Sequence, residues 1–192
     1  MQGVDIKHLG VDIAHAGMDQ RKIHMAAREV FPKMGWSKPI ALHHFLLSGL
    51  TEPPKAAGDA KEDEVFENKM SKSKPDSAIF IHDSPEEIRR KMAKAYCPPA
   101  VERNPVLEMA RFVAFREENA VLKVERPAKF GGDAAFDSYA SLEAAYSEKK
   151  LHAMDLKTAV AAALDAALSP VRKHFESRRE LLKVFEGTQV TR

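Results

Sequence analysis

The chain has 192 residues and a mass of 21.4 kDa, which is enough for one large domain or two small ones. Hydrophobic residues make up 44% of it and charged residues 30%, so it can bury a core, and collagen-like, low-complexity and wholly disordered chains are excluded. The net charge of +2 is too balanced to indicate a partner by itself.

No apolar run approaches the ~18 residues that a membrane span needs, and residues 1–5 lack the basic-then-apolar order of a secretory signal. Cys97 is the single cysteine, which excludes an internal disulfide. We therefore expect no membrane partner and a reducing, cytoplasmic setting.

The first half of the chain alternates helix and strand signals. Residues 17–31 predict a helix capped by Asp19, and short apolar runs predict strands at 39–43 and 78–81. Between residues 51 and 68 six acids face two lysines without an apolar period, which predicts a mobile acidic loop. The apolar face of the first helix is expected to hold Ile23, Ala26, Ala27 and Val30.

Helix signals dominate the second half, apart from a strand predicted at 121–124. Ser84 and Pro85 mark a helix start, with Glu87 closing a capping box. Pro170 should kink or split the last and longest helix. Further helix starts are predicted at Asn104, Ser141 and Asp155. The pattern indicates an α/β segment to about residue 96, followed by a mainly helical domain.

The stretch of residues 69–73 carries the strongest chemical signal. Lys69 and Lys72 lie three positions apart among small hydroxyl residues, so two ammonium groups and several backbone N–H groups can surround a polyphosphate. Mobile point charges of this kind suit the negative charge that develops on a leaving pyrophosphate.

This pentapeptide, Lys69-Met70-Ser71-Lys72-Ser73, matches the KMSKS signature of class I aminoacyl-tRNA synthetases. Its surroundings resemble the archaeal and eukaryotic type of tyrosyl-tRNA synthetase, and the resemblance extends to about residue 175. The matching stretches are residues 17–24, 83–89, 94–98, 126–132 and 151–157. The resemblance implies the second half of a Rossmann-type catalytic domain at 1–96 and a helical anticodon-binding domain at 97–192.

A synthetase of this class begins with half a Rossmann fold that carries a His-x-Gly-His element, and this element does not occur here. Residues 8–11 read His-Leu-Gly-Val and end in valine instead of histidine. We therefore expect a fragment that lacks the N-terminal half of the catalytic domain and is inactive alone. The full-length enzyme would be a homodimer.

The resemblance also implies roles in tyrosine activation. Lys69 and Lys72 would be catalytic, and Asp5 would accept a hydrogen bond from the tyrosine hydroxyl, which is how such a site rejects phenylalanine. The expected tyrosine-binding residues are Gln2, Asp5 and Gln20. The expected ATP-binding residues are His43, Lys69, Met70, Ser71, Lys72 and Ser73.

Other residues are expected to contact tRNA(Tyr). Phe130 would stack on the first anticodon base while His152 and Asp155 contact its edge, as single-stranded RNA is commonly read. Asp155 could instead be only a helix cap, and Phe130 an ordinary core aromatic. The expected tRNA-binding residues are Arg21, Lys22, Lys94, Tyr96, Cys97, Phe130, His152, Asp155 and Lys157.

The expected ligands are tyrosine, tRNA(Tyr) and ATP, the last with Mg²⁺ as a substrate, and no prosthetic group. No metal site is predicted, because the adjacent His43 and His44 point apart on a strand and no cysteine or carboxylate cluster completes a site. Two alternatives stay open: a tryptophanyl-tRNA synthetase relative, and a non-catalytic tRNA-binding module.

Overall fold

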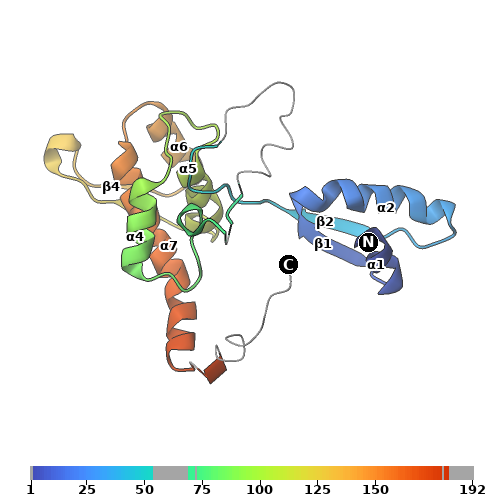
Figure 1. Cartoon of the computed structure of the whole chain (residues 1–192). Coiled ribbons are helices and arrows are strands. Elements are labelled where there is room, and N and C mark those ends of the chain that lie inside the picture. Colours follow the sequence, from blue (N-terminus) through green and yellow to red (C-terminus); the bar gives the residue numbers. More distant parts are fainter. Residues whose placement is uncertain (1, 54–68, 72, 179, 182–192) are drawn as a thin grey trace. The chain divides into compact units, whose positions relative to one another are not determined.

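The computed structural model describes residues 2–53, 69–71, 73–178 and 180–181 (Figure 1). Among these, residues 2–47 and Lys69 form one compact unit, while residues 48–53 and those from 70 onward form a second. The compact units do not follow the predicted domains 1–96 and 97–192, and that functional division stays a prediction. Most of the predicted acidic loop, residues 54–68, lies outside the described residues.

The first unit is a β–α–β arrangement preceded by a short helix (Figure 1). Strands β1 and β2 pair in parallel, with Ile13 opposite Ile40 and Gly17 opposite His44, so the chain between them crosses over as a helix. The elements are α1 (Gln2–His8), β1 (Ile13–Gly17), the 3-10 turn η1 (Met18–Gln20), α2 (Arg21–Lys33) and β2 (Ile40–His44). The predicted strand at 39–43 is thus confirmed, whereas β1 and α1 were not predicted.

Helix α2 packs by a face that shares only Ala27 with the one that apolar spacing predicts. His24, Ala27 and Phe31 are buried, whereas Ile23 and Val30 are 43% and 44% exposed. A histidine can occupy an inward position because His24 Nδ1 lies 3.1 Å from His43 Nε2 and its polar atom is satisfied. The Asp19 cap is also wrong, since the residue before α2 is Gln20 and Asp19 lies within η1.

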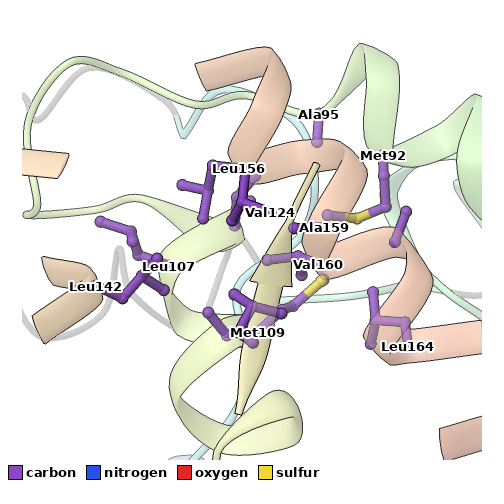
Figure 2. Close-up of a cluster of buried hydrophobic side chains, with 14 of the residues drawn as sticks. Met92, Ala95, Leu107, Met109, Val124, Leu142, Leu156, Ala159, Val160 and Leu164 are labelled. Carbon is purple, nitrogen blue, oxygen red and sulfur yellow. The ribbon is translucent and has the colours of Figure 1, made fainter. Parts of the chain in front are cut away.

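The second unit is mainly helical with one small antiparallel sheet, β3 (Leu122–Val124) and β4 (Ala134–Phe136). Helix α4 (Pro85–Lys94) packs against the long α7 (Ala153–Glu176), which also contacts β3. Figure 2 shows their shared core, where Met92, Val124 and Val160 are among the buried side chains. The remaining elements are η2 (Pro75–Ser77), α5 (Pro105–Met109), a π-helical turn (Ala110–Ala114), η4 (Ala128–Phe130) and α6 (Tyr139–Ser147).

Two of the predicted helix starts in this unit are confirmed and two are displaced by a few residues. The Ser84 hydroxyl accepts from the Glu87 N–H, and the Asn104 side chain accepts from the N–H groups of residues 106 and 107. Helix α6 is capped by Ser138 instead of Ser141. Helix α7 is capped by His152 instead of Asp155, and it runs through Pro170 without being split.

The strand predicted at 78–81 is wrong. Side chains take up the backbone groups that a neighbouring strand would otherwise bind: the Lys91 ammonium donates to Ala78 O at 3.0 Å, and the Asp83 carboxylate accepts from the Phe80 N–H at 2.8 Å. This segment is therefore held by α4 and its own turn instead of a sheet. Among the described residues, no helix is long and apolar enough to cross a bilayer.

Candidate functional site

A cavity of about 710 Å³ opens in the second unit where three segments converge. The segments are the turn between α6 and α7 with the first turn of α7, the η4 loop, and the stretch after α4. Four predicted tRNA-binding residues line it: Cys97, Phe130, His152 and Asp155. The lining also includes residues that sequence reasoning did not single out, namely Pro99, Arg126, Tyr146, Lys149, Lys150, Leu151, Ala153 and Met154.

Arg126 ties two walls of the cavity together. Its Nε donates to Gly132 O at 2.6 Å and its Nη1 donates to Lys150 O at 2.8 Å. The η4 loop that carries Phe130 is thereby bonded to the turn that precedes His152. Gly131 leaves room for this arrangement, because its φ is +98° and a Cβ there would lie 3.4 Å from Arg126 Nη2.

The start of α7 presents a hydrogen-bond donor and an acceptor to this cavity. His152 Nδ1 accepts from the Met154 N–H at 3.2 Å, so in the neutral ring the proton is on Nε2. Asp155, in the first turn of the helix and half-buried, offers carboxylate oxygens. Phe130 is 60% exposed, and the Lys129 ammonium lies 4.9 Å from its ring centroid. Its exposure disfavours the alternative of an ordinary core aromatic.

Cys97 belongs to a hydrogen-bonded cluster in the cavity wall. Its Sγ lies 3.2 Å from the Tyr146 hydroxyl, which donates to Pro98 O at 2.8 Å. Asn104 Nδ2 donates to Pro98 O and Ala100 O, both at 3.2 Å. Burial raises the pKa of Tyr146, so its hydroxyl stays a donor at physiological pH. The cluster gives Cys97 the role of a wall residue and fixes the chain that follows α4.

In the first unit, Lys69 meets the turn between β1 and α2. Lys69 Nζ lies 3.1 Å from Asp19 Oδ2, and Asp19 directly precedes Gln20 in the η1 turn. Lys69 is the main reason that the pKa of Asp19 is held below its ordinary value. Gly17 makes the close turn possible, since a Cβ there would lie 2.8 Å from Asp19 Oδ1. The predicted Lys69 and Gln20 are thus brought together through Asp19, which sequence reasoning had taken for a cap.

Two histidine pairs lie on the β1–β2 sheet and α2. His43 Nε2 is 3.1 Å from His24 Nδ1, and His44 Nδ1 is 3.1 Å from His15 Nε2. Burial is the main cause that lowers the pKa of His43, and the neighbouring His24 and Arg21 lower it further. His43 is therefore neutral near pH 7, with Nδ1 as the ring nitrogen not used by His24.

The remaining predicted tyrosine- and ATP-site residues are dispersed. Gln2 is half-buried and Asp5 exposed on α1. In the second unit Met70 packs against the main core, and Ser71 Oγ lies 2.8 Å from Ser73 Oγ. Lys72 lies outside the described residues. No group of three histidine, cysteine or acidic residues that could hold a metal occurs in the described part of the chain.

The other predicted tRNA-binding residues lie on helices α2, α4 and α7. Arg21 and Lys22 are exposed in the first turn of α2, and Lys94 is exposed at the end of α4. Lys157 donates to Ala93 O at 3.1 Å, so its ammonium binds a carbonyl at the end of α4. The Tyr96 N–H donates to Leu50 O at 2.7 Å. None of these four basic residues lines the cavity.

Three basic residues of the cavity were missed: Arg126, Lys149 and Lys150. The two lysines stand just before His152 in the sequence, so their proximity to it could have been foreseen. Nothing in the spacing indicates that Arg126, 24 positions before Lys150, donates to that residue's carbonyl.

Comparison with known protein families and solved structures shows which proteins this chain resembles. The family model for tRNA synthetases class I (W and Y) matches residues 1–169. The tyrosine–tRNA ligase of Thermococcus sibiricus is 49% identical over 204 aligned residues, which cover 100% of this chain and 52% of that protein. The crystal structure of tyrosyl-tRNA synthetase from Pyrococcus horikoshii, complexed with L-tyrosine, superposes with a TM-score of 0.86 at 47% identity, covering 97% of this chain and 54% of that one.

The tryptophanyl alternative receives less support. Tryptophanyl-tRNA synthetase from Giardia lamblia is 20% identical with a TM-score of 0.54, covering 84% of this chain and 35% of that one, a likeness that shows the fold alone. The chain spans about half the length of the curated relatives that it matches. The family match, the lysine signature and the similarity to the tyrosyl type along the whole of this chain agree, and this chain belongs to the class I tRNA synthetases of the tryptophan and tyrosine family.

Proposed function

We propose that this chain serves a tyrosine–tRNA ligase, in which tyrosine is activated with ATP and transferred to tRNA(Tyr). The observation that carries the proposal is the meeting of Phe130, His152 and Asp155 around one cavity. The similarity to tyrosine–tRNA ligases, which extends along the whole of this chain, supports the proposal and does not favour a non-catalytic RNA-binding module.

The second unit would read the anticodon, which makes it the anticodon-binding domain expected at 97–192. Phe130 is an exposed ring on which a splayed base can stack. His152 Nε2–H can donate to the O6 of a guanine, and the Asp155 carboxylate can accept from its N–H edge. The tRNA that reads the tyrosine codons has guanine as its first anticodon base, so donor and acceptor match this base and mismatch adenine.

The lysine loop would act in the first chemical step. The tyrosine carboxylate attacks the α-phosphate of ATP, the α–β phosphoanhydride bond breaks, and pyrophosphate leaves with the bonding electrons. Lys69 and Lys72 would stabilise the charge that develops on the pyrophosphate. Lys69 is held by Asp19 in this structure, so it must exchange that carboxylate for the triphosphate.

Other activation-site residues would bind and orient the substrates. Gln2, Asp5 and Gln20 would contact tyrosine, with Asp5 accepting from its hydroxyl. His43 and the backbone of the lysine loop would contact ATP. Mg²⁺ would arrive with the ATP as part of the substrate. We also propose a homodimer and, because Cys97 is the single cysteine, a cytoplasmic setting.

Binding of the anticodon stem-loop tests the proposal. The 192-residue chain should bind the stem-loop of tRNA(Tyr) more tightly than the same stem-loop with adenine at the first anticodon position. A titration followed by fluorescence anisotropy measures both affinities at one salt concentration. Equal affinity for the two stem-loops would contradict the anticodon assignment.

Activity tests the other half of the proposal. Fused behind the part of the Pyrococcus horikoshii synthetase that it does not match, the chain should support tyrosine-dependent exchange of pyrophosphate into ATP. The isolated 192-residue chain, assayed alongside, should show none above background. Exchange driven by tryptophan instead of tyrosine would point to the tryptophanyl alternative.

A further inference from the structure

Lys149 occupies a position in the chain that favours glycine. It follows α6 with a φ of +60°, in the left-handed region. The Lys149 N–H donates to Tyr146 O at 3.0 Å, and the Lys150 N–H donates to Ala145 O at 2.9 Å. This pair of bonds is the Schellman motif that ends many helices, and its left-handed residue is usually glycine because a Cβ is strained there. A lysine at this place therefore stabilises the fold less than a glycine would.

The charges of the cavity single out the same residue. Of its three Lys and Arg residues, Arg126 donates to two backbone carbonyls, and the Lys150 ammonium lies 2.5 Å from Glu148 Oε2. Within the described residues, the exposed Lys149 ammonium has no hydrogen bond or ion pair. Among the described residues, Lys149 is thus the cationic side chain of the cavity whose ammonium group is available to bind an anion.

We propose that Lys149 binds a phosphate of the RNA strand whose base enters this cavity. The inference rests on the proposed anticodon function and adds a contact to it. Phe130, His152 and Asp155 meet a base by its face and edge, and a base in that position brings its own phosphates to the rim. A lysine binds a phosphate as a mobile point charge, so the contact adds affinity that does not depend on the base. A lysine at this position therefore lowers the stability of the fold and raises the affinity for RNA.

Substitution by glycine separates the two effects of Lys149, because they have opposite signs. Lys149→Gly should raise the Tm by about 2–4 °C, since the strain at φ +60° is removed. It should also weaken binding of the tRNA(Tyr) stem-loop roughly three- to tenfold at low salt and reduce the slope of log K against log salt by about 0.7–0.9, the value for one phosphate. Lys149→Asn, which tolerates the left-handed region, should lose the same affinity, and Lys149→Arg should keep it.

Arg103→Gly is the matched control, because Arg103 is a basic residue with a φ of +56° that does not line the cavity. Its removal should leave the stem-loop affinity and the salt slope unchanged. Discrimination between guanine and adenine at the first anticodon position should survive Lys149→Gly, because a phosphate contact carries no base information.

The outcomes distinguish this inference from the proposed function. If Phe130→Ala weakens binding and the bases are discriminated, but Lys149→Gly changes neither affinity nor slope, the phosphate contact is wrong and the anticodon site stands. If Arg103→Gly reduces the slope as much as Lys149→Gly, the effect is general charge and the contact is also wrong. If the chain does not bind the stem-loop at all, the proposed function fails and this inference fails with it.

Discussion

Lys69 and Asp19, fifty positions apart in the sequence, form an ion pair in which Nζ and Oδ2 are 3.1 Å apart. Asp19 lies in the η1 turn beside Gln20, so the ion pair joins the start of the lysine loop to the turn that carries a predicted tyrosine-binding residue. The Lys69 side chain is 51% exposed, so it can leave this carboxylate without a large desolvation change. In the proposed activation step, Lys69 would exchange this carboxylate for the triphosphate of ATP.

The titration of Asp19 reports on this pair. Its carboxyl should titrate below its ordinary pKa of 3.8, and Lys69→Ala should raise the pKa toward that value. Because the folded-state pKa is lowered, the pair stabilises the fold above the unfolded pKa, and this contribution is lost as the pH falls through the folded value. Carboxyl ¹³C NMR of the variant measures the pKa directly. Lys33→Ala is the control, since Lys33 pairs with Glu29 on the outer surface of α2 and should leave Asp19 unchanged.

The lysine signature predicts a particular kinetic effect in the fused enzyme. Lys69→Ala and Lys72→Ala should each lower kcat for tyrosine-dependent pyrophosphate exchange by roughly 10²-fold or more, with little change in the tyrosine KM. The reason is that their charge is needed most when the pyrophosphate leaves. Lys74→Ala, a neighbouring lysine outside the pentapeptide, serves as control. A raised tyrosine KM with kcat intact would show instead that these lysines bind the amino acid.

The buried ion pair after the lysine loop should contribute strongly to stability. Lys91 Nζ lies 2.6 Å from Asp83 Oδ2, and the two side chains are only 3% and 6% exposed. Asp83→Asn should therefore lower the free energy of unfolding by roughly 3–5 kcal/mol, because it leaves a buried ammonium without its counter-ion. Urea unfolding measures the loss.

The double variant Asp83→Asn/Lys91→Met is the informative companion. Since it removes the unpaired charge as well, it should be less destabilised than Asp83→Asn alone. The single variant Lys91→Met completes the comparison. If the double variant lost as much unfolding free energy as Asp83→Asn and Lys91→Met together, the two residues would not be coupled, and other contacts would hold the segment 78–83.

Local sequence signals predicted the parts of this fold that depend on local interactions. The Ser84 and Asn104 caps are confirmed. Each cap depends only on a side-chain oxygen and a backbone N–H two or three residues further along the chain. The errors arise where a distant group takes over. The strand predicted at 78–81 gives way to contacts from Lys91 and Asp83, and the inward face of α2 is chosen by a histidine bonded to β2.

The same contrast applies to the candidate site. Phe130, His152 and Asp155 were predicted from stretches that resemble the family, and the structure places them around one cavity. Arg126 was missed because its guanidinium bonds to carbonyls that lie 6 and 24 positions away, and Lys149 was missed because a left-handed helix end usually carries glycine and not lysine. Neither feature has a signature in spacing or composition.

The cap at the start of α7 gives His152 and Asp155 different structural roles within the proposed anticodon site. His152 caps the helix, so Asp155 is not its N-cap, and the Asp155 carboxylate lies in the first turn, where we propose that it meets a base. Asp155→Ala should therefore change the stability by no more than ~1 kcal/mol, the usual size of a charge in the first helical turn. His152→Ala should lower the free energy of unfolding by about 1 kcal/mol, because it removes the side chain that caps the helix.

Affinities for the stem-loops should distinguish the role of Phe130 from that of Asp155. Phe130→Ala should weaken binding to stem-loops with guanine or adenine at the first anticodon position alike, by about 1–3 kcal/mol, because stacking accepts any base. Asp155→Ala should mainly weaken binding to guanine and so narrow the difference between the two, because the carboxylate accepts from an N–H edge that adenine does not present in the same place. Glu148→Ala, which removes a neighbouring carboxylate paired with Lys150, should leave that difference unchanged. Anisotropy titrations of the three variants with both stem-loops measure this, and equal losses for guanine and adenine in Asp155→Ala would show that Asp155 does not read the base.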